Sequence, residues 1–368
     1  DIQAFKIDDY RCLKIYEECE KNGLKILMHT GDNRYDYSNP NRLLPILEIY
    51  KNLTVIGAHF GGWSIWDKAP QILCKYKNLY VYKEEYQFAI RQLINHYDCD
   101  IREFANQQRK QGDQYGFVNY LANNNGFTLA DCFMYNDKHN EANGENNKDG
   151  SEHNFSWNCG LEGPSKKKAL VQLRAKQLRN AFAMVMLAQG IPLIYGGDEF
   201  GNSQQGNNNV YGQDNELSWV QWNTAKNAKD LLDYVKKLIK FRNAHGVFHA
   251  QKEASQSDYK STGIPDLSYH AESAWYSGFE AYRRHLGMMY GNAYVENEKN
   301  PIYVAYNLHQ AEHEFGLPTL PKGRKWNVIL DTAKEMEQFT PEGDKISDQR
   351  ILKLNGRTIC VLEGMADE

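Results

Sequence analysis

The chain has 368 residues, which is enough for two or three domains, and its hydrophobic content of 41% can supply a sizeable core. Its formal net charge of -4 argues against a protein that binds nucleic acid or a membrane surface, because both classes usually carry a basic patch. No apolar run approaches the roughly 20 residues that a membrane span requires, so no membrane partner is expected.

The number and spacing of the cysteines indicate the redox compartment of the protein. The seven cysteines are scattered and odd in number, and no two form a C-x-x-C pair. This pattern indicates free thiols in a reducing compartment and predicts a cytoplasmic protein, rather than a disulfide scaffold or a zinc-thiolate site. The chain begins at Asp1 with neither a methionine nor a signal-peptide pattern, so we expect its natural start to lie upstream.

The first part of the chain alternates helix and strand patterns. Amphipathic or capped segments predict helices, and short apolar runs predict buried strands. In chain order these are a helix over 8–23, a strand over 24–28, a helix over 41–52, a strand over 53–62, a helix over 66–78 and a strand over 79–82. Short connections between such elements predict a parallel sheet with right-handed crossovers.

The pattern changes from Lys83 onward. The predicted elements are helices over 84–96 and 99–110, a strand over 116–122, a helix over 164–190, a strand from 191 and a helix over 229–246. The Asn-rich and Gly-rich stretch 136–163 is too polar for a core, but it contains Phe155 and Trp157, which disordered tracts usually lack. We therefore predict a long ordered loop there, and long ordered loops in compact enzymes are often functional.

The last part of the chain predicts a small β domain. Strand patterns occupy 302–309, 325–332 and 357–364, with turn residues between them. Residues 246–298, which precede them, are predicted to be irregular.

Two segments, "LKILMHTGDNRYDYSNPNRL" and "LTVIGAHFGGWSIWDKA", give residues 1–81 a resemblance to the amidohydrolase-related metal-dependent hydrolases. That resemblance implies that His29 and His59 stand at strand ends and face a divalent metal, zinc or manganese. Neutral imidazole is a good ligand for such ions. The family's His-x-His pair from its first strand is absent, and no third ligand follows in this segment. The resemblance therefore favours a truncated barrel without a tightly held metal.

Residues from about 84 to the end resemble the isoamylase and glycogen-debranching branch of the α-amylase clan. The resemblance rests on "VNYLANNNGFTLADCF" with the Asn-rich run after it, on "GIPLIYGGDEFGNSQQGNNNVYGQDNELSWVQW", and on "FRNAHGVFH" with "PDLSYHAESAWY". It implies a (β/α)8 barrel that hydrolyses α-glucans and a C-terminal β-sandwich. Under it, 116–122 is the seventh barrel strand and 191–197 the eighth. The ligand implied is an α-glucan or maltooligosaccharide, and no cofactor is implied.

The catalytic loop after the seventh strand departs from the family's form. Relatives carry His-Asp-Gly-Phe-Thr-Leu, whereas this chain has Asn124 and Asn125 before Gly126. Asn125 thus occupies the position of the clan's third carboxylate. An amide can hydrogen-bond sugar hydroxyls, but it cannot act as a nucleophile or proton acceptor. The strands that should carry the nucleophile and the acid lie upstream, where the amidohydrolase-like segment stands instead.

Other residues of this part have expected roles. We expect Asn123 to contact the sugar as part of this turn. The remaining candidates for the sugar cleft are Asp214, Asn215 and Trp219. For Trp219, a packing role is an equal alternative. We expect Asp198 and Glu199 to anchor loops by hydrogen bonds, in preference to catalysis. For His139 we expect a loop-ordering hydrogen bond in preference to metal binding.

The fold class that follows is α/β: a partial (β/α) barrel assembled from two barrel fragments, then a C-terminal antiparallel β-sandwich. The expected domains are 1–82, amidohydrolase-like; 83–298, the C-terminal part of a debranching-type barrel; and 299–368, the β domain. Strands from the two fragments are too few to close an eight-stranded barrel. The join, between Val81 and Glu84, could be a real fusion, a remnant or an assembly artefact.

Three functions remain open at this point. The first is an α-glucan debranching hydrolase lineage that is catalytically incomplete. The second is a metal-dependent amidohydrolase or decarboxylase that uses His29 and His59. The third is a non-catalytic glucan-binding remnant.

Overall fold

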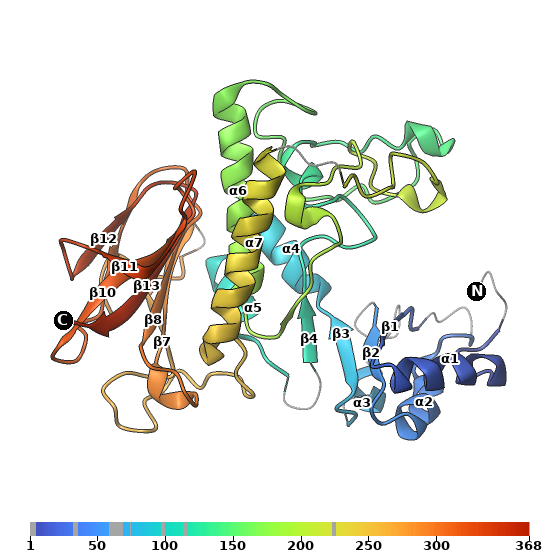
Figure 1. Ribbon diagram of the computed structural model, residues 1–368, viewed down its shortest axis with the longest axis horizontal. Coiled ribbons are helices and arrows are strands. Elements are labelled where there is room, and N and C mark those ends of the chain that lie inside the picture. The colour runs from blue at the N-terminus through green and yellow to red at the C-terminus, as the bar shows by residue number, and fades with distance from the viewer. Residues whose placement is uncertain are drawn as a thin grey trace.

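The computed structural model describes residues 5–31, 36–58, 69–73, 75–96, 100–112, 116–222, 226–280 and 282–367. Within these ranges a parallel sheet lies at the N-terminal end of the molecule, antiparallel sheets lie at the C-terminal end, and the longest helices stand between them (Figure 1). No helix among the described residues combines the length and the apolar character needed to cross a bilayer.

The parallel sheet has five strands in the order β1-β2-β3-β4-β5. They are β1 (Lys25–Met28), β2 (Thr54–Gly57), β3 (Leu79–Tyr82), β4 (Gly116–Asn119) and β5 (Ile191–Pro192). β3 pairs in parallel with β2 on one side and with β4 on the other, so Tyr80 lies opposite both Ile56 and Gly116. The expected join near residues 81–84 therefore passes through the middle of one continuous sheet.

Seven α-helices accompany the described strands. They are α1 (Tyr10–Lys21), α2 (Leu43–Ile49), α3 (Ala69–Leu73), α4 (Glu84–Asn95), α5 (Ile101–Arg109), α6 (Lys168–Met186) and α7 (Lys226–Ala244). Asp9 and Asp100 cap α1 and α5, because their carboxylates accept the backbone N–H two residues on. Each helix overlaps a predicted one. Short 3-10 turns are η1 (Pro40–Arg42), η3 (Asp131–Phe133), η4 (Glu141–Asn143), η5 (Asp198–Phe200), η6 (Val210–Gly212), η7 (Gly246–Phe248) and η8 (Asn292–Tyr294).

The C-terminal region contains two antiparallel sheets. Its strands are β6 (Leu267–His270), β7 (His285–Tyr290), β8 (Ile302–Asn307), β9 (His313–Gly316), β10 (Arg324–Asp331), β11 (Phe339–Lys345), β12 (Ile351–Leu354) and β13 (Thr358–Ala366). Six of them form a sheet in the order β11-β10-β13-β8-β7-β6, and β12 pairs with β9. The antiparallel β domain is thus confirmed.

Two expectations about its start are wrong. Residues 246–298 are not wholly irregular, because β6 and β7 lie there, and the sheet begins at Leu267, well before 299. The sequence "LSYH" is short and polar, so β6 lacks the apolar alternation that marks a strand. Its pairing with the fully buried strand β7 determines its conformation instead.

The main core lies where the helices meet the sheets. Buried side chains of α4, α5, α6 and α7 pack with apolar residues of β7, β8 and β13 in one cluster. A second cluster joins α1 and α2 to the strands β1–β3, and a third fills the space between the two antiparallel sheets. The contact between the parallel sheet and the C-terminal domain is therefore made through the helices, as Figure 1 shows.

Candidate functional site

Two long loops interlock beside the end of β4. The first covers 136–163 and the second 202–215, and we call them together the asparagine-rich loops. Asn140 and Asn208, one from each loop, exchange hydrogen bonds: Asn140 Nδ2 donates to Asn208 Oδ1 at 2.8 Å, and the backbone N–H of Asn208 donates to Asn140 Oδ1 at 2.9 Å. Asn208 Nδ2 also donates to Asn154 Oδ1 at 2.8 Å. The predicted ordered loop is confirmed.

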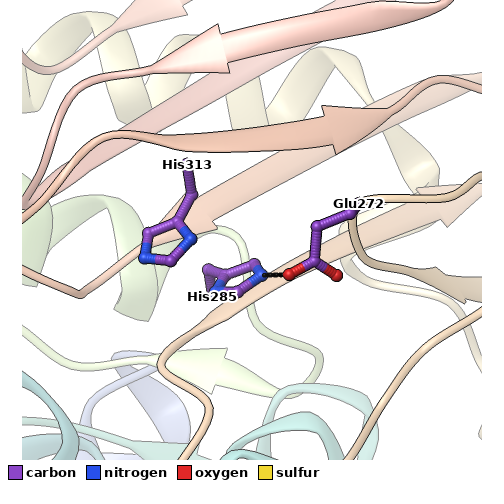
Figure 2. Close-up of side chains that lie close together, drawn as sticks. All are labelled: Glu272, His285 and His313. Carbon is purple, nitrogen blue, oxygen red and sulfur yellow. Dashed lines mark hydrogen bonds and ion pairs between the residues drawn. The ribbon is translucent and has the colours of Figure 1, made fainter.

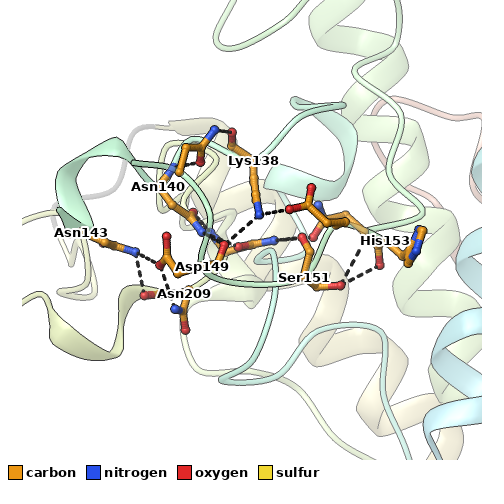
Figure 3. A network of polar contacts seen from close by, with 11 residues as sticks. Lys138, Asn140, Asn143, Asp149, Ser151, His153 and Asn209 are labelled. Carbon is orange, nitrogen blue, oxygen red and sulfur yellow. Dashed lines mark hydrogen bonds and ion pairs between the residues drawn. The ribbon is translucent and has the colours of Figure 1, made fainter. Parts of the chain in front are cut away.

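Asp149 connects further amides of the same assembly (Figure 3). Its Oδ2 accepts from Asn143 Nδ2 at 2.7 Å and from Asn209 Nδ2 at 2.8 Å. The hydrogen bond from Asn143, followed by that from Asn209, lowers the pKa of the Asp149 carboxyl group. Lys138 is buried and donates to the backbone oxygen of Asp149 at 2.9 Å. Side-chain amides thus satisfy backbone groups that no helix or strand satisfies here.

His139 also orders the loops. Its backbone N–H donates to Gly206 O at 2.7 Å, and its Nε2 lies 3.3 Å from Glu162 Oε1. The expected loop-ordering role is therefore confirmed.

The asparagine turn after β4 is held by hydrogen bonds and exposes two amides. Asn123 Oδ1 accepts the backbone N–H of Asn125 at 2.9 Å, and Gly126 follows with φ of +107°, which favours glycine. Gly126 N–H donates to Asn208 O at 3.1 Å, which ties the turn to the second loop. The side chains of Asn124 and Asn125 are exposed, and no hydrogen bond of theirs occurs within the part of the chain that the structure describes.

Arg91 of α4 donates hydrogen bonds to the backbone on both sides of this turn. The guanidinium is buried, and it donates to Leu121 O at 2.7 Å, to Asn154 O at 3.0 Å and to Phe127 O at 3.3 Å. One side chain therefore holds both flanks of the turn and the first asparagine-rich loop.

The carboxylates after β5 are anchors. Asp198 is 2% exposed, and its Oδ1 accepts the backbone N–H of Leu129 at 2.9 Å. Burial raises the pKa of Asp198 to about 8. Glu199 Oε2 accepts the backbone N–H of Gly197 at 2.8 Å. Both groups serve the loop anchoring that the sequence predicted.

Asp214, Asn215 and Trp219 form a local group on the surface. Trp219 Nε1 donates to Asp214 Oδ1 at 3.0 Å, and Asn215 Oδ1 accepts the backbone N–H of Leu217 at 3.0 Å. The Trp219 side chain is 52% exposed, which does not fit a core packing role. No hydrogen bond between described residues joins this group directly to Asn124 or Asn125. The asparagine-rich loops connect the two, because Gln213 Nε2 donates to Ala142 O at 2.8 Å.

Sequence reasoning missed two exposed aromatic residues of the same segment. Tyr211 is 88% exposed and Trp222 is 77% exposed. The Trp222 ring lies 5.7 Å from that of Phe200, centroid to centroid. We call Tyr211, Trp219 and Trp222 the aromatic face. The signal that could have found it is the spacing of three aromatic residues within twelve positions of a polar, Asn-rich segment.

Among the described residues, the strand ends supply few catalytic groups. His29 follows β1 and is exposed, whereas its expected partner His59 lies outside the described residues, so the metal pair is not placed. Lys83 follows β3, where it is buried and donates to Gln107 O at 3.0 Å; burial lowers its pKa to about 7.

Glu84 is a carboxylate that the sequence analysis overlooked. It is partly buried at the first position of α4, directly after β3. Burial and then the charge of Glu84 raise the pKa of the Tyr120 phenol, which follows β4, so the two groups are neighbours. Retaining hydrolysis needs two carboxylates about 5 Å apart across the bond that is cleaved. The next carboxylate, Glu85, is adjacent on the helix, and adjacent helical positions do not face each other.

Comparison with known proteins identifies a matching family model and several relatives. Residues 269–363 match the family model "Isoamylase, C-terminal". Over 271 residues the chain is 34% identical to the glycogen operon protein GlgX homolog of Mycobacterium tuberculosis, a match covering 67% of this chain and 37% of the relative. It is 38% identical to the glycogen debranching enzyme of Pectobacterium carotovorum, which covers 71% of this chain and 36% of that enzyme. Isoamylase 1 of Arabidopsis thaliana is 32% identical over 75% of this chain and 33% of its own length.

The chain is related to the α-glucan debranching enzymes. It spans about a third of the length of these curated relatives. Solved structures agree in fold: a type I pullulanase from Bacillus subtilis, complexed with maltose, covers 98% of this chain with a TM-score of 0.66 at 14% identity. A pullulanase from Anoxybacillus, complexed with maltotetraose, has a TM-score of 0.63 at 16% identity over 98% of this chain.

The structural comparisons also cover the N-terminal segment, residues 1–82. The pullulanase structures cover nearly all of this chain, so β1–β3 are included in the shared fold. These comparisons lend no support to the predicted amidohydrolase-like origin of residues 1–82.

Proposed function

We propose that this chain binds α-glucans at the surface formed by the asparagine turn and the aromatic face, and that it does not hydrolyse them. The observation that carries the proposal is the aromatic face itself. Three large aromatic side chains stand exposed within twelve positions of one polar segment, and the first of them, Tyr211, belongs to the second asparagine-rich loop. Amides and aromatic rings suit the hydroxyls and the apolar faces of sugars.

The ligand class is a maltooligosaccharide or a longer α-glucan. The pullulanases of similar fold were solved with maltose and with maltotetraose. In our proposal Asn123, Asn124 and Asn125 contact sugar hydroxyls, while Trp219 with Asp214 and Asn215 borders the sugar chain. No cofactor takes part, because neither binding nor carboxylate-based glycoside hydrolysis uses one.

We infer the absence of hydrolysis from the catalytic carboxylates that the described residues lack. We interpret the parallel sheet as part of a (β/α) barrel in which β4 and β5 correspond to strands seven and eight. In that arrangement Asn125 replaces the third carboxylate, and β1 and β2 occupy the upstream positions where the nucleophile and acid would be needed. Asp198 is buried as an anchor, so it supplies neither role. His59, which the sequence paired with His29 as a metal ligand, lies outside the described residues, so no metal role enters the proposal.

Replacing Trp222 with alanine is expected to weaken binding of maltoheptaose about fivefold. A sugar ring that covers one face of the indole removes roughly 40 Å² of apolar surface from water, which is worth about 1 kcal/mol. Isothermal titration of maltoheptaose into both proteins measures the change in Kd. Trp275→Ala is the control, because Trp275 is also exposed, at 51%, but lies in the C-terminal domain. Equal affinities for the wild type and Trp222→Ala would refute the aromatic face as the binding surface.

A further inference from the structure

A compact group of metal-ligand side chains lies in the C-terminal domain, remote from the loops discussed above. Glu272 belongs to the segment between β6 and β7, His285 begins β7, and His313 begins β9. One ligand atom from each lies within 4.8 Å of the others. Figure 2 shows the three side chains turned toward one another from three separate segments.

The group connects the two antiparallel sheets. β7 belongs to the six-stranded sheet and β9 to the two-stranded sheet. The rings of His285 and His313 stack with centroids 4.1 Å apart and an interplanar angle of 20°. An ion held by both histidines would therefore crosslink the sheets.

The guanidinium of Arg283 places a positive charge among these side chains. Its Nη1 lies 2.8 Å from Glu272 Oε1, 2.7 Å from Glu272 Oε2 and 2.8 Å from His285 Nε2. These three atoms converge on one position, and that position carries a positive charge. A guanidinium nitrogen cannot accept a hydrogen bond, so His285 Nε2 meets it with a lone pair.

The hydrogen bonding around His285 Nε2 contains a conflict. The same nitrogen lies 2.9 Å from Glu272 Oε1, which is also an acceptor when ionised. A neutral imidazole nitrogen cannot accept from Arg283 and donate to Glu272 at once. A metal ion removes the conflict, because it accepts lone pairs from both atoms.

His313 supplies the third donor. One of its ring nitrogens belongs to the compact group, and its Nε2 is buried without a hydrogen-bond partner among the described residues. An imidazole binds metal ions through the lone pair of a ring nitrogen.

We propose that Glu272, His285 and His313 bind a zinc-like divalent cation that crosslinks the two sheets of the C-terminal domain, and that the Arg283 guanidinium moves aside when the ion binds. Two imidazoles and one carboxylate are a donor set suited to Zn²⁺ or Co²⁺, and they leave a position for water. An all-oxygen set would be needed to favour Ca²⁺ or Mg²⁺. The proposal is independent of glucan binding.

The test is a titration of ZnCl₂ into chelator-washed protein without a polyhistidine tag, followed by calorimetry and by thermal unfolding. We expect one ion per chain and a rise in Tm. His313→Gln should weaken zinc binding at least tenfold, while His249→Ala, an exposed histidine elsewhere, should leave it unchanged. Since His313 is only partly buried, this variant keeps the fold, and circular dichroism checks that it does.

The variant Arg283→Gln tests more directly where the ion binds. It removes the competing cation, so zinc affinity should rise several-fold, whereas a purely structural role for Arg283 predicts no gain. Co²⁺ absorption should show d–d bands without thiolate charge transfer, which excludes the cysteines as ligands. Absence of saturable zinc binding, or binding that persists unchanged in His313→Gln, would overturn the site. Unchanged or weaker affinity in Arg283→Gln would overturn the placement of the ion.

Discussion

Replacing Arg91 with methionine is expected to lower the free energy of unfolding by about 3 kcal/mol. Methionine keeps most of the aliphatic volume but donates no hydrogen bond, so the buried oxygens of Phe127 and Asn154 lose the partner that they have among the described residues. Each buried acceptor left unsatisfied costs about 1–3 kcal/mol. Leu121 O retains a bond from Gln87, which limits the loss. Urea denaturation of the two proteins measures the difference.

The matched control for this prediction is Arg350→Met. Arg350 is exposed, and its hydrogen bonds use backbone atoms, so we expect a change below about 0.5 kcal/mol. If Arg91→Met were as mild as the control, the inference that α4 holds the asparagine turn in place would be wrong.

Replacing Asp198 with asparagine is expected to stabilise the protein at pH 8 relative to the wild type, and much less at pH 5. Burial raises the folded-state pKa of Asp198 to about 8, whereas an unfolded aspartate has a pKa near 3.9. The stability that protonated Asp198 contributes is therefore complete below about pH 4 and is lost as the pH rises toward 8. Asparagine is neutral throughout and can still accept from the backbone N–H of Leu129 through its oxygen.

Thermal unfolding at pH 5, 6, 7 and 8 tests this prediction. The gap in stability between the variant and the wild type should widen with pH, by up to about 1.4 kcal/mol per unit. Asp137→Asn, at an exposed carboxylate, should show no such widening. A gap that narrows with rising pH would contradict the assignment of a protonated, buried Asp198.

Much of the fold was accessible from the sequence because local patterns determine it. The short apolar runs before His29 and after Asn78 are strands, and the capped amphipathic segments are helices, as expected. Only the second of these strands is mostly buried, because Leu27 of the first is 48% exposed. Asn-Gly turn chemistry likewise predicted the bend at Asn125 and Gly126. These features depend on neighbours within a few positions of each other.

Features that depend on distant partners were not accessible. Asn140 and Asn208 are 68 positions apart, and polar composition alone does not identify which amides will pair. β6 was missed for the same reason, since its partner β7 determines it. The change of sequence character near Lys83 suggested two separate pieces, yet β3 pairs on both sides within one sheet. Strand pairing requires compatible backbone geometry, and it does not require a common sequence pattern.

The exposure of the aromatic face was also beyond sequence reasoning. Trp219 and Trp222 are three positions apart in the same polar segment, and either could have packed inward. Burial depends on which other elements cover the segment, and no local rule supplies that information.

We propose that this chain binds an α-glucan and leaves it intact. Saturation-transfer difference NMR on a branched maltooligosaccharide tests both halves in one sample. We predict saturation transfer to the sugar protons, reduced in Trp222→Ala, with the anomeric signals of the α-1,6 and α-1,4 linkages unchanged after a day. Absence of transfer, or conversion of linkage signals into those of free reducing ends, would contradict the account.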